Sequence, residues 1–241
     1  MPDAIFDKCL EAGISIPAAA PKQLAEYLRS LIEWNQRMDL TAITNPQDII
    51  TRHFVDSLMP IGIDGMLPMD ASVIDVGSGA GFPGLPLAIA RPDIRVTLLD
   101  AQKKRVGFLS AVIDALSLTN VKVIHGRAED TAAMPAHKES YDRAIARAVA
   151  PLNLLLEYLL PFVKIGGAAL CWKGPLVARE WLDGEYAAAS LGGRLKTPIK
   201  VSLPNEDFCL RLVLCEKETA ISARFPRKAG IAAKRPLQNK P

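Results

Sequence analysis

From Ser72 onward, short apolar runs alternate with helical stretches, and this alternation limits the possible folds more than any other feature of the sequence. Short apolar runs predict strands, and between two of them residues 103–116 repeat apolar side chains on one helical face. The predicted strands cover residues 73–76, 95–99, 121–124, 144–146 and 168–172. Repeated strand–helix units predict an α/β fold, with a mostly parallel sheet and helices on both faces.

The segments on either side of this repeat predict further helices and one more strand. From Pro21 the apolar residues recur at intervals of three and four through Trp34, which predicts one helix that ends near Asn35. Further helices are expected over residues 48–58, 151–160 and 177–190, a linker over 61–70, and a last strand over 208–215, with an antiparallel edge position as one option. We therefore divide the chain into an N-terminal helical extension (1–65), an α/β domain (66–218) and a C-terminal arm (219–241).

The C-terminal arm is basic, whereas the rest of the chain is slightly acidic. The formal net charge of the chain is +3, and residues 219–241 contain no acid, so the remainder carries about −3. The six basic residues of the arm are Arg224, Arg227, Lys228, Lys234, Arg235 and Lys240. Such an arm predicts a polyanionic partner, although a tail that only aids solubility would have the same composition.

Composition excludes several classes of protein. No apolar stretch approaches the ~20 residues of a membrane span, and no basic start is followed by an apolar run, so we expect a cytoplasmic protein without membrane contact. The four cysteines lack metal-ligand spacing and, except for Cys9, lie in apolar segments that should be buried. The three histidines are far apart. We therefore expect no metal site.

A glycine-rich motif follows the first strand of the repeat and opens a helix. It runs from Asp75 to Gly84 as DVGSGAGFPG. The glycines at 77, 79 and 81 let the backbone approach a ligand, and the helix that follows offers unpaired N–H groups to a polar or anionic group. The spacing Gly79-x-Gly81-x-x-Gly84 is a weak signal alone, because nicotinamide dinucleotide sites and structural turns also show it.

Residues after the next two strands favour one cofactor. Asp100 ends the second strand, where a carboxylate accepts hydrogen bonds from ribose hydroxyls of either NAD or S-adenosylmethionine. Ala128 and Glu129 lie just past the third strand, where the class I methyltransferase fold binds the edge of the adenine ring. This position favours S-adenosylmethionine.

An ordered series of short motifs extends over nearly the whole chain. The motifs are Trp34-Asn35, Leu40-Thr41, Arg52-His53 with Asp56-Ser57, the glycine motif, Leu99-Asp100 with Lys104-Arg105, Arg127-Ala128-Glu129, Ala146-Arg147-Ala148, Lys173-Gly174 and residues 225–237. In this order they resemble the RsmG (GidB) family of bacterial 16S rRNA guanine-N7 methyltransferases. The resemblance implies a class I Rossmann-like methyltransferase fold and methyl transfer from S-adenosylmethionine to N7 of guanine 527, standard numbering, in 16S rRNA.

The resemblance also implies cofactor contacts and a partner. The expected cofactor-binding residues are Gly77, Gly79, Phe82, Asp100 (for the ribose), Ala128, Glu129 and Arg147. Arg147 follows the fourth strand, where it would pair with the methionine carboxylate or grip an RNA phosphate. The expected partner is 16S rRNA or a precursor of the small ribosomal subunit, not DNA, and the protein is expected to be a monomer.

The residues after the fourth strand bear on the reaction. Residues 146–151 lack the Asn/Asp-Pro-Pro-aromatic motif of enzymes that methylate an exocyclic amine, and Cys171 looks buried and unsuited to cytosine-C5 methylation. Guanine N7 has a free lone pair and no hydrogen, so its methylation needs positioning and no general base. We expect no catalytic acid or base.

Basic residues outside the glycine motif are the candidates for RNA contacts. They are Arg52, His53, Lys173, Arg194, Lys196 and, in the arm, Arg227, Lys228, Lys234 and Arg235. His53 fits a structural role equally well. We expect the arm to pack on the body through Phe225 and Ile231. Two alternatives stay open: an NAD-dependent Rossmann oxidoreductase, and a non-catalytic RNA-binding ribosome-assembly protein.

Overall fold

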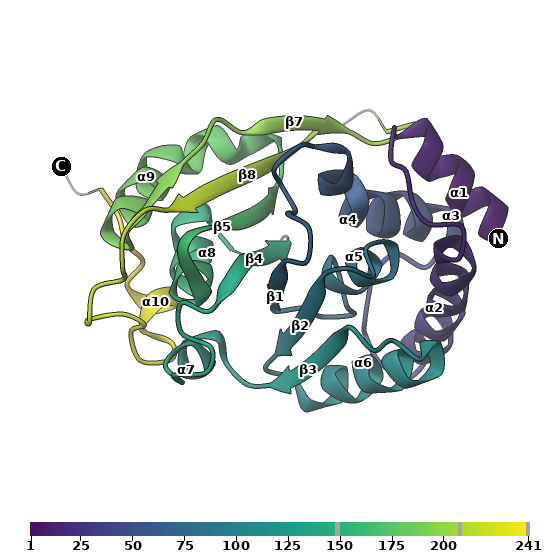
Figure 1. Cartoon of the computed structure of the whole chain (residues 1–241), viewed down its shortest axis with the longest axis horizontal. Helices are drawn as coiled ribbons and strands as arrows, with labels where there is room; N and C mark the ends of the chain where they lie inside the picture. Colours follow the sequence, from purple (N-terminus) through teal and green to yellow (C-terminus); the bar gives the residue numbers. More distant parts are fainter. Residues whose placement is uncertain (148–149, 207–208, 240–241) are drawn as a thin grey trace.

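The predicted strands form the parallel part of one sheet in the computed structural model, which describes residues 1–147, 150–206 and 209–239. These strands are β1 (Ser72–Val76), β2 (Arg95–Asp100), β3 (Val121–His125), β4 (Tyr141–Arg147) and β5 (Val163–Lys173). They lie side by side in the order β3-β2-β1-β4-β5, all parallel (Figure 1). The chain order reverses between β1 and β4, and the crevice at the carboxyl ends of strands beside such a reversal is where open α/β sheets bind ligands.

Three further strands extend the sheet beyond β5. Strand β8 (Cys209–Lys217) is antiparallel to β5, and β6 (Gly193–Leu195) and β7 (Ile199–Ser202) both pair with its other side. The direction expected for the last strand is therefore confirmed, but the edge position is wrong, because β8 is covered on both sides. Strands β6 and β7 are too short to show a two-residue period, so the sequence did not reveal them. Phe208, the expected first residue of this strand, lies outside the described residues.

The first face of the sheet is covered by helices from the N-terminal half. Helices α1 (Pro2–Glu11), α2 (Ala20–Asn35), α5 (Gly84–Ala90) and α6 (Lys103–Leu116) lie there. Helix α2 has the predicted bounds and buries the predicted apolar stripe from Leu24 to Leu31, with Trp34 half-buried, and it packs against both α5 and α6. One hydrophobic cluster joins these helices to the sheet, so residues 1–65 share a core with the domain that follows.

The opposite face is covered by helices from the C-terminal half. Here lie α7 (Ala128–Ala132), α8 (Leu152–Leu159), the 3-10 helices η3 (Leu160–Phe162) and η4 (Pro175–Glu180), α9 (Trp181–Ser190) and α10 (Ile231–Lys234). The single helix expected over 177–190 is thus a 3-10 turn followed by α9. A second hydrophobic cluster joins α8, α9 and the arm to this face.

The helix predicted over residues 48–58 is present but changes type along its length. It runs as α3 (Pro46–Ile49), the π-helix η1 (Ile50–Val55) and α4 (Asp56–Leu58), and a 3-10 turn η2 (Met59–Gly62) follows. Asn45 caps the start, since its side chain accepts hydrogen bonds from the N–H groups of Gln47 and Asp48. Wider turns of the π type occur often at functional sites, and η1 faces the cavity described below.

Three expectations about burial need correction. Ile231 is 38% exposed and Ala232 carries the buried contact of the arm, together with Phe225 as expected. Cys9 is fully buried, because it lies on the inner side of α1, a helix that the sequence did not reveal. Cys209 is only half-buried, since it begins β8 near the end of the sheet. None of the described helices is long and apolar enough to cross a membrane.

Candidate active site

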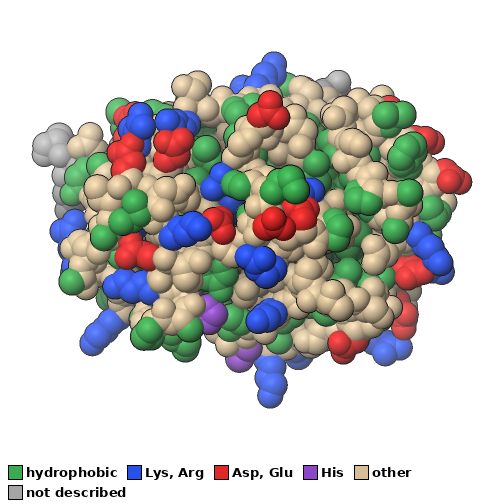
Figure 2. Space-filling view, in the orientation of Figure 1, with side chains coloured by type: hydrophobic (Ala, Val, Ile, Leu, Met, Phe, Trp, Pro, Cys, Tyr) green, Lys and Arg blue, Asp and Glu red, His purple; other side chains and the backbone are tan. Residues whose placement is uncertain are grey.

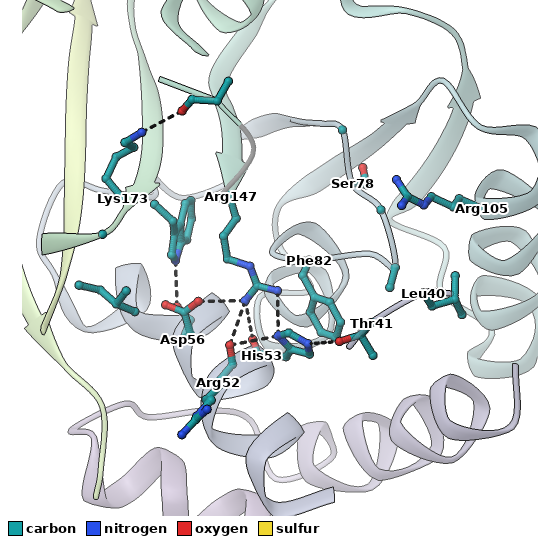
Figure 3. A pocket seen from close by; sticks show the side chains of 17 residues that line it. Leu40, Thr41, Arg52, His53, Asp56, Ser78, Phe82, Arg105, Arg147 and Lys173 are labelled. Carbon is teal, nitrogen blue, oxygen red and sulfur yellow. Dashed lines mark hydrogen bonds and ion pairs between the residues drawn. The ribbon is translucent and has the colours of Figure 1, made fainter. Parts of the chain in front are cut away.

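Two hollows lie side by side at the carboxyl ends of the parallel strands. The larger, about 650 Å³, is lined by charged and polar side chains of η1, the glycine loop and the ends of β4 and β5, and we refer to it as the charged cavity (Figure 3). The smaller, about 340 Å³, is lined mainly by backbone and apolar side chains of the strand ends, α7 and α8, and we refer to it as the apolar pocket. Gly77 and Ala150 line both.

The glycines of the motif have two different tasks. Gly77 and Gly79 have left-handed φ angles of 75° and 59°, and a Cβ at Gly77 would meet no atom within 4 Å. At Gly81, by contrast, a Cβ would lie 2.7 Å from the Tyr27 hydroxyl, and at Gly84 it would lie 2.5 Å from Leu98 Cδ2. The first two glycines therefore leave open space beside the loop, whereas Gly81 lets the loop approach Tyr27 of α2 and Gly84 lets the start of α5 pack against β1 and β2.

Two carboxylates hold the glycine loop in place. Asp100 accepts the N–H of Gly79 through Oδ2 at 2.9 Å and that of Gln102 through Oδ1 at 2.7 Å. Asp75 is fully buried and accepts the N–H of Gly84 at 2.8 Å, and burial raises its pKa to about 7. The acid that the sequence placed before the first glycine is therefore a loop support, and Asp100 combines loop support with the expected position at the end of β2.

The apolar pocket has a carboxylate on one wall. Ala128 and Glu129 line it from α7, as the motif order predicted, and Tyr158 lines it from α8. Glu129 is nine-tenths buried, and its Oε1 accepts the N–H of Gly230 at 2.8 Å. Gly230 and Ala233 complete the wall, so the C-terminal arm is part of this pocket, which sequence reasoning missed. An apolar slot beside open glycine backbone fits the flat base and the polar chain of S-adenosylmethionine.

Arg147 is the centre of a network in the charged cavity. It extends from the end of β4, and its Nη1 donates to Asp56 Oδ2 at 2.9 Å and to the carbonyl of His53 at 3.3 Å. Its Nη2 lies 3.2 Å from His53 Nδ1, and its guanidinium lies over the ring of Phe82, 4.9 Å from the centroid (Figure 3). Arg147 thus fastens helix η1 to the sheet.

His53 is held as a neutral ring within this network. Burial and the neighbouring Arg147 lower its pKa from 6.5 to about 4. Its Nε2 lies 2.8 Å from Thr41 Oγ1, and its ring packs on Phe82 with centroids 4.6 Å apart. Its Nδ1 lies near both the Arg147 guanidinium and the Arg52 carbonyl, the latter at 3.1 Å. Both nitrogens are therefore engaged.

Asp56 is a member of the network to which the sequence assigned no role. Its side chain is nearly buried, and burial raises its pKa while Arg147 opposes that rise. Oδ2 binds Arg147, whereas Oδ1 has no hydrogen-bond partner among the described residues. Trp172 donates from Nε1 to the Asp56 carbonyl at 2.9 Å. The sequence signal for this network was the spacing on one helix, where Asp56 follows His53 by three residues and Arg52 by four.

Outside the arm, the lysines and arginines proposed for RNA contacts all have acidic partners. Those around the charged cavity already have acidic partners: Arg52 forms two hydrogen bonds with Glu206, at 2.7 and 3.1 Å, and Lys173 lies 2.6 Å from Glu180. Further out, Arg194 and Lys196 pair with acids of β8 and the residue after it.

In the arm, one of the basic residues proposed for RNA contacts has an acidic partner, whereas three have none among the described residues. Arg227 binds the buried Glu157 through two hydrogen bonds. Lys228, Lys234 and Arg235 are exposed, and no carboxylate pairs with them in the part of the chain that the structure describes. Figure 2 shows Lys and Arg side chains gathered on the left of this view, over the region where Figure 1 places α10. Within the described ranges, no three His, Cys, Asp or Glu side chains gather in a way that could hold a metal ion.

Comparisons with known proteins identify the family. The family model for GidB, rRNA small subunit methyltransferase G, matches residues 20–207. The chain belongs to this family. Ribosomal RNA small subunit methyltransferase G of Alkaliphilus metalliredigens is 43% identical over 96% of this chain and 97% of its own, and that of Leuconostoc citreum is 42% identical over 98% of each.

Solved structures show the same fold at low sequence identity. A chain from the complex of the Haloferax volcanii Trm112 methyltransferase activator with a methyltransferase matches with a TM-score of 0.55 at 16% identity, covering 70% of this chain and 91% of that chain. A transferase of Pyrococcus horikoshii matches with a TM-score of 0.51 at 16% identity, covering 66% of this chain and 62% of that chain. The expected class I methyltransferase fold is confirmed.

Membership in the methyltransferase G family decides the class of reaction. The chain is an S-adenosylmethionine-dependent methyltransferase that acts on small-subunit rRNA. The alternatives of a nicotinamide-dependent oxidoreductase and of a non-catalytic assembly protein are therefore set aside.

Proposed function

We propose that the enzyme methylates N7 of a guanine, guanine 527 in the standard numbering of 16S rRNA. The observation that carries this proposal is the absence, among the described residues of the charged cavity, of a side chain prepared to accept a proton. His53 engages both ring nitrogens within the protein, and Asp56 is paired with Arg147 through Oδ2 while its Oδ1 is buried out of reach of the cavity. Guanine N7 bears no hydrogen, so positioning is sufficient for its reaction.

We propose that the apolar pocket receives the adenosine part of the cofactor and that the glycine loop leads the rest into the charged cavity. Ala128, Glu129 and Tyr158 would surround the base, the carboxylate of Asp100 would accept from the ribose, and Gly77 and Gly79 would offer open backbone. When bound, S-adenosylmethionine supplies a methyl group on a positively charged sulfur. The chain itself orients the reactants and excludes water from between them.

Arg147 and Phe82 would form the wall against which the guanine is oriented. Arg147 is only 12% exposed and is bound to Asp56, His53 and backbone carbonyls, so its contacts favour a positioning role over a grip on an RNA phosphate. Arg52, His53 and Lys173 would shape the rim of the charged cavity in the same way, since their charges or hydrogen bonds are already compensated.

The arm would supply the phosphate contacts. Lys228, Lys234 and Arg235 are exposed cations without acidic partners in the described chain, and cations of this kind release counterions when they bind RNA. Arg227 would anchor the arm, because its charge is neutralised by Glu157. We also propose that the enzyme works as a monomer in the cytoplasm, since one chain contributes both hollows and ribosomal RNA is the substrate.

The test is to locate the methyl group. Unmethylated 16S rRNA and small subunits would be incubated with the enzyme and S-adenosylmethionine, and 7-methylguanine would be mapped by base-specific chain cleavage and by mass spectrometry. We expect one 7-methylguanine, with none formed by a Gly77→Val variant. A methyl group on an exocyclic amine, or on another base, would contradict the proposal. Comparison of the two substrates also determines whether assembly is required.

A further inference from the structure

The C-terminal arm presents different chemistry on its two sides. On the inner side, Gly230 and Ala233 line the apolar pocket. On the outer side, Lys228, Lys234 and Arg235 face solvent, and their sequence neighbours within the arm include no acid. One short segment thus touches the space for the cofactor and also carries unpaired positive charge.

The arm is fastened to the elements that form the rest of the pocket. The Glu129 carboxylate of α7 accepts the N–H of Gly230 at 2.8 Å, and the Glu157 carboxylate of α8 binds Arg227. Asn153, also on α8, donates from Nδ2 to the carbonyl of Leu237 at 2.6 Å. Because these fastenings end on α7 and α8, which line the same pocket, a displacement of the arm would remove one wall of the pocket.

The contact at Gly230 is a specific feature of the closed arm. Gly230 has a φ angle of 80°, which favours glycine, and this conformation presents its N–H to Glu129. Glu129 is nine-tenths buried, and a buried carboxylate needs such donors. If the arm lifted, this carboxylate would have to find water in place of the Gly230 N–H.

We propose that the arm is a strap that closes over the adenosine end of the cofactor, and that rRNA bound to its outer cations holds it closed. This inference rests on the proposed position of the cofactor in the apolar pocket. It predicts that rRNA and S-adenosylmethionine bind cooperatively, because each favours the closed arm. Linkage requires that each ligand tighten the other by the same factor.

The experiment measures the release of S-adenosylmethionine from the full-length protein, with and without saturating 16S rRNA transcript. In the wild type we expect the transcript to slow release by about five-fold or more, the lower end of common coupling strengths. In the Lys228→Gln/Lys234→Gln/Arg235→Gln variant, the slowing by RNA, measured against that variant's own release without RNA, should be lost. A matched variant, Lys22→Gln/Arg29→Gln on α2, across the molecule from the arm, should behave as wild type (Figure 1).

The contact between the arm and α8 is tested by Glu157→Gln, which weakens the ion pair with Arg227 and does not change a residue of the pocket lining. Release of S-adenosylmethionine without RNA should become faster, and bound RNA should slow it again in part. The proposal is overturned if RNA leaves release unchanged in the wild type, or slows it equally in the triple variant. Both results are independent of which atom is methylated, so failure here and failure of the N7 assignment are distinguishable.

Discussion

The apolar pocket and the charged cavity share Gly77 but are built on different principles. The apolar pocket is formed by strand ends, α7, α8 and the arm, and its lining is mostly apolar, with one buried carboxylate. The charged cavity is formed by η1 and by the ends of β4 and β5, and its side chains are bound to one another before any ligand arrives.

This difference shows that positive charge near an active site does not by itself mark a nucleic-acid contact. Arg52, Arg147 and Lys173 line the charged cavity, yet each lies within 2.9 Å of a carboxylate. Such ion pairs fix the positions of these side chains, and an RNA phosphate would have to compete with the carboxylate already present. Lys228, Lys234 and Arg235 of the arm, which have no carboxylate partner among the described residues, lie outside both hollows, where an extended polyanion can reach them.

The largest effect should come from Gly77, which lines both hollows. In Gly77→Val, a β-branched side chain must adopt a left-handed φ angle and would project into the shared space, so we expect binding of S-adenosylmethionine to fall below detection in calorimetry. Gly107→Val on α6 is the matched control, because a Cβ at Gly107 also meets no atom within 4 Å and no left-handed φ is needed. Equal affinity in both variants would remove the glycine loop from the site.

A change in the charged cavity should separate catalysis from cofactor binding. Lysine cannot reach Asp56 and His53 together, so Arg147→Lys should release η1 from β4 and lower kcat by about 100-fold, the scale of a 1 Å misplacement. The Kd for S-adenosylmethionine should change little, because the apolar pocket is intact. Arg95→Lys at the start of β2 serves as the control. A loss confined to cofactor affinity would instead assign Arg147 to the methionine carboxylate.

The sequence predicted the apolar pocket better than the charged cavity. Strand periodicity and the motif after each strand located Gly77 and Glu129, which line the pocket, and Asp100, which lies between the lining residues Leu99 and Ala101, because the carboxyl ends of parallel strands meet at one edge whatever the connecting loops do. The separate tasks of Gly77 and Gly81 were not visible, since a fixed spacing does not tell which glycine meets open space and which meets a helix.

The charged cavity and the arm depend on contacts between distant segments, which sequence periodicity does not report. Asp56 and Arg147 are 91 residues apart, and Gly230 and Glu129 are 101 residues apart. The composition of the arm predicted basic residues available to a polyanion, and Lys228 is exposed in that way, but Arg227 is paired with Glu157 on the mostly apolar helix α8. Only the fold shows that Glu157 is accessible to the arm.

A smaller effect is expected at Asp100, which lies between Leu99 and Ala101 of the apolar pocket lining. Asp100→Asn keeps one carbonyl oxygen for the Gly79 N–H but loses the charge and one acceptor, so the affinity for S-adenosylmethionine should fall about ten-fold, or roughly 1.4 kcal/mol. Affinity for the rRNA transcript, measured without cofactor, should not change. Asp114→Asn on the exposed side of α6 is the control. A loss of RNA affinity would contradict the division between the two hollows.

The smallest effect should be that of pH on the rate, because the charged cavity orients its substrate without exchanging a proton. His53 has a pKa of about 4 and stays neutral from pH 6 to pH 8, so kcat at saturating cofactor should vary less than about two-fold in that range. Asp75, with a pKa of about 7, titrates there but is fully buried beneath the loop, and Asp75→Asn should leave the profile flat. A steep, bell-shaped profile would instead reveal a general base.

Below pH 6 the network around Arg147 and His53 should weaken. The direction of this effect on stability follows from the lowered pKa of His53. The pKa of His53 is lower in the folded protein than its ordinary 6.5, so the unfolded chain binds more protons between pH 6.5 and pH 4. The stability that neutral His53 contributes is therefore present above pH 6.5 and lost as the pH falls toward 4, when a protonated ring would face Arg147. The difference in unfolding free energy between wild type and His53→Gln should narrow over this interval. A constant difference would mean that His53 is not held between Thr41 and Arg147 as a neutral ring.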